Sequence, residues 1–159
     1  MIRALHASDM DRVVSIWLDA NLQAHSFIPS EYWKNNLEYV REALPLAEVH
    51  VYEDAQGVQG FIGLDGDHIE GLFVAKEMRS HGIGKQLMDH VKQGRVALTL
   101  EAYRKNAGAV RFYQREGFIP ACCYLVLTAE TGDAGIVEVV SLDEWDGGLQ
   151  RFSCFRTML

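Results

Sequence analysis

Residues 69–85 read IEGLFVAKEMRSHGIGK, and this stretch decides the fold. Its first part, up to Val74, has the apolar character of a strand, whereas Ile83 begins a helical repeat of apolar residues. Between the two lies a tight loop with glycines at positions 82 and 84. A strand, a glycine loop and a helix in direct succession indicate a protein that builds helices onto a sheet.

The loop at residues 79–85 has the features of an anion-binding site. The first N–H groups of a helix have no partner inside the helix and lie at the positive end of its dipole, so they attract phosphate or pyrophosphate. Gly82 and Gly84 let the backbone approach such a group closely, and Arg79 and Lys85 add positive charge. The same glycines also suit a plain strand-to-helix turn, and neither the Walker pattern nor the Rossmann fingerprint is present.

Outward from this stretch, the hydrophobic pattern predicts a fold of the α/β class with a mixed sheet flanked by helices. The predicted order is β-α-α-β-β-β-α-β-α-β, with an early hairpin and later βαβ crossovers. Strands are expected at residues 1–5, 47–52, 58–64, 68–74, 96–102 and 118–127. Helices are expected to begin at the N-cap Ser8, near Ser30, at 79–84 and at 106. Residues 136–140 are a further candidate strand.

Length and charge limit the classes of protein that fit. A chain of 159 residues suits one domain, which we expect to span residues 1–159. The net charge of −7 argues against nucleic acid as a partner and favours a cationic or amine-bearing substrate. No apolar stretch approaches the ~18 residues of a membrane span, and the first residues do not resemble a signal peptide. Three cysteines without metal-ligand spacing indicate a reducing cytoplasm and no metal site.

A second informative segment covers residues 98–118, where strand, turn, short helix and strand follow one another again. Together the two segments resemble the GNAT superfamily of N-acetyltransferases. The first matches its acyl-CoA-binding motif as Arg79-x-x-Gly82-x-Gly84, and the second matches its later motif from Asn106 through Tyr113 to Phe118. Both motifs occur in the family's order and on matching elements.

The resemblance extends over roughly residues 1–122 and is most specific for the bacterial YiaC/YjaB branch. The segments that carry it are 16–18, 25–28, 32–33 and 73–74, which read IWL, HSFI, YW and FV. Residues 128–159 depart from the family pattern.

The resemblance implies the cofactor acetyl-CoA, held in a sheet whose central strands are splayed and bulged. Gly71, inside a strand, suits such a bulge or a close backbone approach. Backbone groups of Leu72, Phe73 and Val74 are then expected to pair with the pantetheine arm, and a strand N–H to face the thioester oxygen. The pyrophosphate is expected against Arg79, Ser80, His81, Gly82, Ile83, Gly84 and Lys85. Of these, His81 is expected to be a bystander.

Two residues of the second motif have family roles. Asn106 resembles the asparagine that contacts the cofactor, and it also suits an N-cap for the next helix. Tyr113 resembles the tyrosine that binds near the thiol and protonates the departing thiolate; the alternative is an aromatic residue of the core. A phenol with a pKa of about 10 can donate this proton while staying neutral at pH 7.

The acceptor amine must lose a proton before it reacts, because a lysine-like amine has a pKa of about 10.4. Glu70 is the first candidate for the base and His68 the second, two residues away on the same face of the strand. His25, Phe27 and Glu101 are expected to border the acceptor, although a structural hydrogen bond also suits His25, and Glu101 is a further candidate base. Plain structural roles remain open for Glu70 and for the side chains of Leu72 and Val74.

The expected reaction is direct transfer in a ternary complex, because proximity and orientation supply much of the catalysis. Cys122 and Cys123 are therefore not assigned as nucleophiles. Three readings stay open: an acetyltransferase for protein lysine, one for a small amine such as a polyamine, amino acid or antibiotic, and an acyl-CoA-binding module without turnover. A monomer or homodimer is expected.

Overall fold

The computed structural model describes residues 1–103, 105–119 and 139–142. Its strands are β1 (Ile2–Ala4), β2 (Glu48–Asp54), β3 (Gly57–Asp65), β4 (His68–Val74), β5 (Thr99–Tyr103) and β6 (Val139–Leu142). Its α-helices are α1 (Met10–Ala24), α2 (Ser30–Asn35), α3 (Leu37–Ala43), α4 (Ile83–Lys92) and α5 (Ala107–Arg115). Short 3₁₀ turns lie at Ala7–Asp9, Leu44–Leu46 and Lys76–Met78. No helix in these ranges is long and apolar enough to cross a bilayer.

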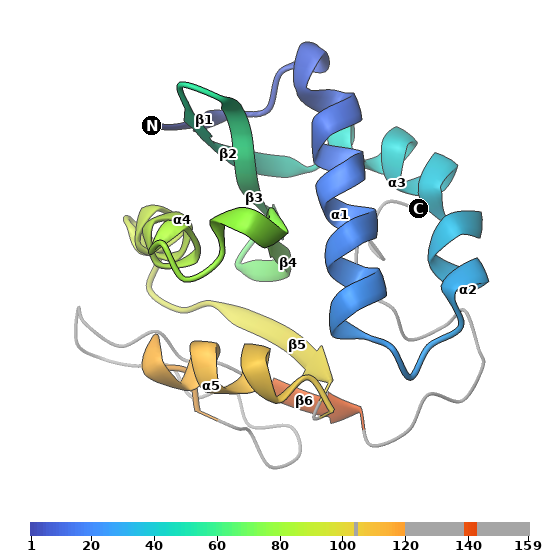
Figure 1. The fold of residues 1–159 in the computed structure, drawn as a ribbon. Coiled ribbons are helices and arrows are strands. Elements are labelled where there is room, and N and C mark those ends of the chain that lie inside the picture. The colour runs from blue at the N-terminus through green and yellow to red at the C-terminus, as the bar shows by residue number, and fades with distance from the viewer. Residues whose placement is uncertain (104, 120–138, 143–159) are drawn as a thin grey trace.

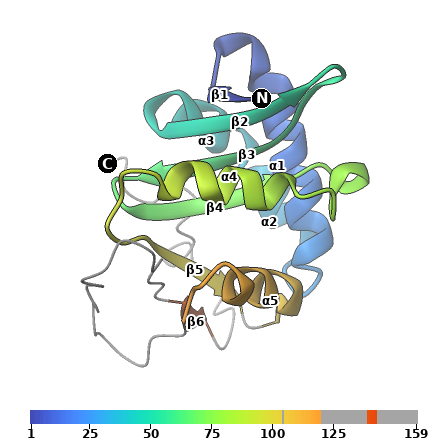
Figure 2. The ribbon, with the colours of Figure 1, turned by 90° about the vertical axis from the view of Figure 1, so that its left-hand side faces the viewer.

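The described strands form a six-stranded mixed sheet in the order β1-β2-β3-β4-β5-β6. Pairing is antiparallel from β1 to β4 and parallel from β4 to β6. Helices α1, α2 and α3 lie on one side of the sheet and α4 lies on the other (Figures 1 and 2). The predicted α/β class, the early hairpin and the mixed sheet are confirmed.

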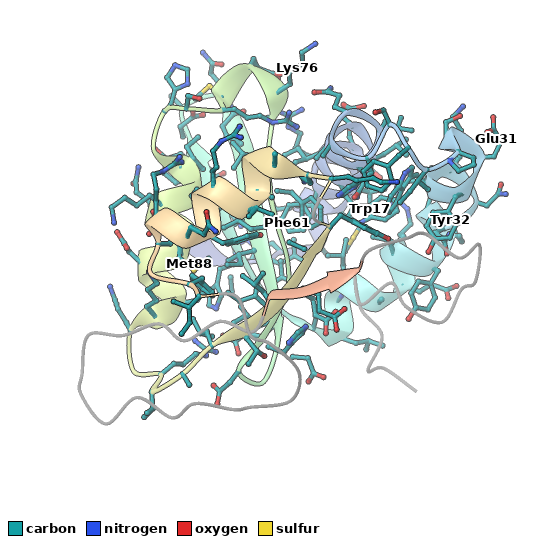
Figure 3. All side chains as sticks on the ribbon, turned by 90° about the horizontal axis from the view of Figure 1, so that it is seen from below. Trp17, Glu31, Tyr32, Phe61, Lys76 and Met88 are labelled. Atoms are coloured by element: carbon teal, nitrogen blue, oxygen red, sulfur yellow. The ribbon has the colours of Figure 1, made fainter. Side chains whose placement is uncertain are left out.

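Two apolar cores hold the helices onto the sheet, and alternation along β3 serves both. Phe61 belongs to the core under α1 to α3, which also contains Trp17, whereas its neighbour Ile62 belongs to the core under α4 and α5. Trp17 and Trp33 meet edge to face in the first core, with ring centroids 5.7 Å apart. Figure 3 shows Trp17 and the α4 residue Met88 on opposite sides of the strands.

The first two predicted helices differ from the structure: the first has another N-cap, and the second begins at Ser30 as predicted but is divided. Ser8 lies inside a 3₁₀ turn, and the next residue, Asp9, is the N-cap of α1. The Asp9 carboxylate accepts from the His6 N–H at 2.8 Å and pairs with Arg3 of β1 at 2.7 Å, so contacts outside the helix decide where it begins.

The helix expected from Ser30 onward is divided into α2 and α3 at Asn36. The Asn36 side chain donates to the Tyr32 carbonyl at 2.7 Å and competes with the backbone there.

The strand boundaries after β4 also differ from the prediction. The strand predicted at 96–102 begins at Thr99 and ends at Tyr103. Phe118 and Ile119 belong to no strand, and the rest of the strand predicted at 118–127 lies outside the described residues. The neighbour of β5 is Val139–Leu142, which overlaps the candidate strand at 136–140.

Two irregularities of β4 create the space for a site. Gly63 of β3 pairs with Gly71 and the next residue, Leu64, pairs with Ile69, so Glu70 is an extra residue in β4. This bulge resets the alternation: Ile69 and Leu72 both contact the α4-side core, although they are three positions apart. On its other edge, β4 pairs with β5 at His68–Thr99 and Ile69–Leu100, after which the two strands diverge (Figure 1). The predicted bulge and splay are confirmed.

Candidate functional site

The splay forms a wedge between β4 and β5, with its vertex at the Ile69–Leu100 pair. One limb of the wedge is Leu72–Val74, which is bonded to β3 along its other edge. In a strand, alternate backbone groups point to opposite edges, so this limb presents N–H and C=O groups toward the wedge. An extended ligand placed there would add to β4 as a further strand does.

The loop that follows β4 turns its backbone sharply before α4 begins. Ser80 has a φ of +63° and Gly82 a φ of +79°, both in the left-handed region. Gly82 is the N-cap of α4, and its carbonyl accepts the first helical bond, from the Gln86 N–H at 3.0 Å. The N–H groups of Ile83, Gly84 and Lys85 therefore precede the first helical bond and lie at the positive end of the helix dipole. This arrangement suits an anion.

The two glycines of the loop serve different purposes. A Cβ at Gly82 would meet no atom within 4 Å, so glycine is favoured there by its positive φ. At Gly84 an added Cβ would lie 3.4 Å from the Leu72 side chain and 3.4 Å from the Phe112 ring. Gly84 thus lets the start of α4 pack closely against β4 and α5.

The charged side chains of the loop are engaged within the protein. The Arg79 Nε donates to the Val74 carbonyl at 3.2 Å, and its guanidinium also donates to Gln23 of α1 at 3.1 Å. The Lys85 ammonium contacts Asp89 at 2.9 Å, and this hydrogen bond raises the pKa of Lys85. His81 is exposed, and its Nδ1 bonds the Arg79 carbonyl at 2.8 Å. Arg79 therefore lies at the junction of the wedge and the loop, whereas Lys85 is directed along α4.

The second motif places Asn106 and Tyr113 at the two ends of α5. Asn106 is the N-cap, and its Oδ1 accepts from the Ala109 N–H at 3.1 Å, so the capping role is confirmed. Tyr113 is 8% exposed and belongs to the α4-side core, with its ring 5.7 Å from Phe118. Its aromatic packing agrees with a core role, and its position on α5 agrees with the family motif.

The two candidate bases differ in their relation to the wedge. Glu70 is only 6% exposed and is the bulged residue next to the vertex. His68 lies on the closed side of the vertex, where its Nδ1 bonds the Thr99 hydroxyl at 2.7 Å. Because Ile69 faces the α4-side core, the alternation directs His68 to the opposite face of the sheet.

The residues expected at the acceptor lie on that opposite face. The His25 ring stacks on the Trp33 ring, with centroids 5.4 Å apart. Its centroid also lies 5.0 Å from that of Tyr103 and 5.7 Å from that of Phe27. Burial lowers the pKa of His25 to about 4, so its imidazole is neutral at pH 7. Glu101 is exposed on β5, and alternation places it on the same face as Tyr103.

Asn21 and Tyr103 were missed by reasoning from the sequence. Asn21 is 1% exposed on α1, and its Oδ1 lies 3.0 Å from Nδ1 of His25. A polar residue on the apolar face of a helix was the available signal. Tyr103 ends β5 at the open side of the wedge, and nothing in its sequence context distinguishes it from a core residue.

A hollow within the described ranges is lined by none of the predicted site residues. The hollow, of about 590 Å³, lies at the edge of the sheet between β1, β2 and α3, away from the wedge and the loop. No group of three or more histidines, cysteines or carboxylates in these ranges is arranged to hold a metal ion.

Similarity to known protein families covers the part of the chain that forms the wedge and the loop. The family model described as an acetyltransferase (GNAT) domain matches residues 45–120. The chain is 37% identical over 120 residues to the peptidyl-lysine N-acetyltransferase YiaC of Escherichia coli, covering 74% of this chain and 82% of that protein. It is 31% identical over 118 residues to the peptidyl-lysine N-acetyltransferase YjaB of Salmonella typhimurium, covering 74% and 81%.

Solved structures share the fold. The solution structure of apo-form YjaB from Escherichia coli has a TM-score of 0.65 at 30% identity and covers 72% of this chain and 78% of that one. The PaiA N-acetyltransferase of Thermoplasma acidophilum, solved in complex with coenzyme A, has a TM-score of 0.68 at 19% identity, covering 76% and 90%.

Proposed function

Because this chain belongs to the GNAT family of acetyltransferases and is an acetyl-CoA-dependent N-acetyltransferase, we propose that its acceptor is the side-chain amine of a lysine in a protein. The observation that carries the proposed acceptor is the similarity to two peptidyl-lysine N-acetyltransferases. The wedge between β4 and β5 and the left-handed loop at the start of α4 are where we place acetyl-CoA. The cytoplasm, indicated by three cysteines without metal-ligand spacing, is part of the same proposal.

The residues of the wedge and the loop fit coenzyme A. Its extended arm would pair with the free edge of Leu72–Val74, and its pyrophosphate would lie against the N–H groups of Gly82 to Lys85. When bound, acetyl-CoA supplies the acetyl group as a thioester. Arg79 would have to exchange its bond to the Val74 carbonyl for one to the phosphates, which its position beside the loop permits.

Glu70 remains the first candidate for the base. It is buried beside the vertex of the wedge, where a carboxylate reaches an amine held over β4. An amine with a pKa of about 10.4 is protonated at pH 7, so Glu70 would accept its proton before or during attack. His68 would serve less directly, because its Nδ1 is bonded to Thr99 on the closed side of the vertex.

Tyr113 is the candidate acid. Its phenol can donate a proton to the sulfur that leaves. The backbone N–H groups of the bulged strand would meanwhile donate to the thioester oxygen as it gains charge.

A lysine acceptor agrees with the relatives, which are named peptidyl-lysine N-acetyltransferases, and with the net charge of −7. The wall on the acceptor side is aromatic: Phe27 and Tyr103 lie with ring centroids 5.2 Å apart. Aromatic rings can pack along the methylene chain of a lysine and attract its ammonium through their faces.

A thiol-release assay with acetyl-CoA tests the proposal across three classes of amine: lysine-containing peptides, polyamines and free amino acids. We expect turnover with the peptides and little with the other classes. Preference for a polyamine or amino acid would assign the enzyme to small amines, and binding of coenzyme A without any turnover would make the chain a binding module.

The Glu70→Gln variant tests the base in the same assay, and His68→Gln is its matched control. Glu70→Gln should lower kcat by about 100-fold, because the variant cannot accept the proton, while the Kd for coenzyme A stays unchanged. His68→Gln should change kcat less. The opposite ranking would move the role of base to His68.

A further inference from the structure

A continuous line of hydrogen bonds joins α1 to the start of α5. Asn21 donates from Nδ2 to the Trp17 carbonyl at 2.9 Å, and its Oδ1 lies 3.0 Å from Nδ1 of His25. On the other side of the imidazole, Nε2 lies 3.5 Å from the Nδ2 of Asn106, whose Oδ1 accepts from the Ala109 N–H at 3.1 Å. The line therefore ends on a backbone group at each side.

These two ends determine the direction of every bond between them. A backbone carbonyl can only accept, so Asn21 must present its NH₂ to Trp17 and its oxygen to His25. A backbone N–H can only donate, so Asn106 must present its oxygen to Ala109 and its NH₂ to His25. The Asn21 end requires a proton on Nδ1, and the Asn106 end requires a free lone pair on Nε2, so the two ends together specify a neutral imidazole.

The surroundings of the line also favour the neutral form. Asn21 is 1% exposed and Trp33, which stacks on the imidazole, is 1% exposed. Burial lowers the pKa of His25 to about 4. Tyr103 also contacts the ring, edge to face. The Lys105 ammonium lies 5.3 Å from the centroid of Phe27, which itself contacts His25.

We propose that Asn21 and His25 are positioning residues, which hold the amide of Asn106 in one orientation and thereby set the first turn of α5 against the wedge. The inference rests on the proposed acetyl transfer, because α5 carries Tyr113 two turns farther on, at ~10 Å along the helix. If His25 were protonated, its Nε2–H would face the NH₂ group of Asn106, and two donors cannot bond each other. The amide could then bond only after a flip that breaks the cap.

Nitrogen NMR of the unchanged protein tests the line without any assay of activity. We expect ¹⁵N shifts of His25 that report a proton on Nδ1, with no protonation of Nε2 between pH 8 and about 5. A proton on Nε2, or titration near the ordinary value of about 6.5, would overturn the inference. If the variants below do not fold, these ¹⁵N shifts still test the direction of the hydrogen bonds in the line.

Variants at His25 test whether the line acts on turnover. His25→Gln retains one acceptor and one donor, whereas His25→Phe fills the aromatic site but can form neither bond. We expect His25→Phe to lower kcat by about 10- to 100-fold in the folded protein, and His25→Gln to recover much of the loss. Equal kcat in wild type and His25→Phe would overturn the positioning role.

Asn21→Leu should lower kcat as His25→Phe does. Its control is Asn36→Leu, since Asn36 also donates to the carbonyl four residues earlier but has no part in the line. Asn36→Leu should affect thermal stability and leave kcat unchanged. Equal loss of kcat in both variants would reduce Asn21 to a structural residue.

A pH profile gives the readout that a structural role would not move. Asn21→Asp places a carboxylate beside the imidazole, which raises the pKa of His25 toward or above about 6.5. The profile of kcat should then gain an acidic limb in this range, and the double variant Asn21→Asp, His25→Gln should lose it. An acidic limb that persists in the double variant would contradict the inference.

The outcomes separate this inference from the function on which it rests. If the wild-type protein acetylates no amine, the proposed lysine acceptor is rejected. The NMR measurement still tests the hydrogen-bond line in that case. Wild type that turns over normally beside an unaffected His25→Phe would remove only the positioning role.

Discussion

Phe73 lies over Gly71 on the α1-facing side of β4, where an added Cβ would overlap its ring. Gly71 is one of the two β4 residues at the bulge, and Phe73 stacks on Phe61 with ring centroids 5.0 Å apart. The shape of the wedge limb therefore depends on one missing side chain. At Gly60 of β3, by contrast, an added Cβ would meet the backbone carbonyl of Phe73.

Gly71→Ala should destabilise the fold by about 1–3 kcal/mol, because the new methyl group forces the Phe73 ring from its place. Denaturant unfolding measures this change. A double-mutant cycle with Phe73→Leu gives the coupling, which should be favourable because a smaller side chain relieves the overlap. Additive effects of the two substitutions would contradict the explanation.

Tyr113→Phe should lower kcat by about 100-fold and leave the Kd for coenzyme A unchanged, because only the phenolic proton is lost. The ring packs between Phe112 and Phe118 and is accommodated as phenylalanine, so the folded structure should survive. Single-turnover kinetics and calorimetric titration measure the two quantities. Unchanged turnover would return Tyr113 to the plain core role.

At the scale of elements, the junction of β4, its loop and α4 brings the two parts of the proposed cofactor site together. The 3₁₀ turn Lys76–Met78 and the left-handed residues that follow reverse the chain, so that α4 begins beside the end of β4. Gly84 then permits close contact with Leu72 and Phe112. An anion at the start of α4 and an extended chain along β4 are thus neighbours.

Gly82→Ala should weaken coenzyme A binding, and Gly94→Ala is its matched control. Both glycines have nearly the same positive φ, +79° and +77°, and neither would place a Cβ within 4 Å of another atom. Gly94 lies beyond the other end of α4. Left-handed strain of about 1–2 kcal/mol should lower the stability of both variants, whereas only Gly82→Ala alters the anion site.

Calorimetric titration with coenzyme A distinguishes the two glycine variants. Equal Kd values in Gly82→Ala and Gly94→Ala would show that the loop does not bind the phosphates.

At the scale of the whole molecule, the sheet separates two cores, and the site residues that we propose are divided between them. The core under α4 and α5 contains Tyr113 and packs against the loop helix, whereas the core under α1 to α3 reaches Tyr103 and the aromatic wall. The line through His25 crosses from the second core to the start of α5. Protonation of His25 at low pH should therefore lower the stability of the fold and disturb the site at the same time.

His25 should make the protein less stable as the pH falls from about 6.5 to about 4. The folded state holds the pKa near 4 by burial, so in this window the unfolded chain binds a proton that the folded chain does not. Its contribution is complete above pH 6.5 and decreases by about 3 kcal/mol at pH 4.

Unfolding free energies of wild type and His25→Gln between pH 7 and 4.5 measure this effect. The difference between the two proteins should change with pH in that direction, because glutamine does not titrate. A constant difference would mean that His25 titrates normally.

The order of elements, the hairpin, the bulge at Gly71 and the glycine loop were all predictable from the sequence. Each rests on local patterns, such as alternation along 58–64 or the spacing of Gly82 and Gly84, and local patterns are set by neighbours in the chain. The division at Asn36 and the role of Asp9 as N-cap were not predictable, because a side chain or a distant strand competes with the backbone there.

The sequence by itself determined the class of fold, the family and the pair of motifs proposed to bind the cofactor. Only the tertiary structure decided that Glu70 lies at the vertex and His68 on its closed side, since that depends on where β4 and β5 separate. It alone brought His25 to Asn106, 81 positions along the chain. Contacts at such separation depend on how the elements pack, and no local pattern of residues specifies that packing.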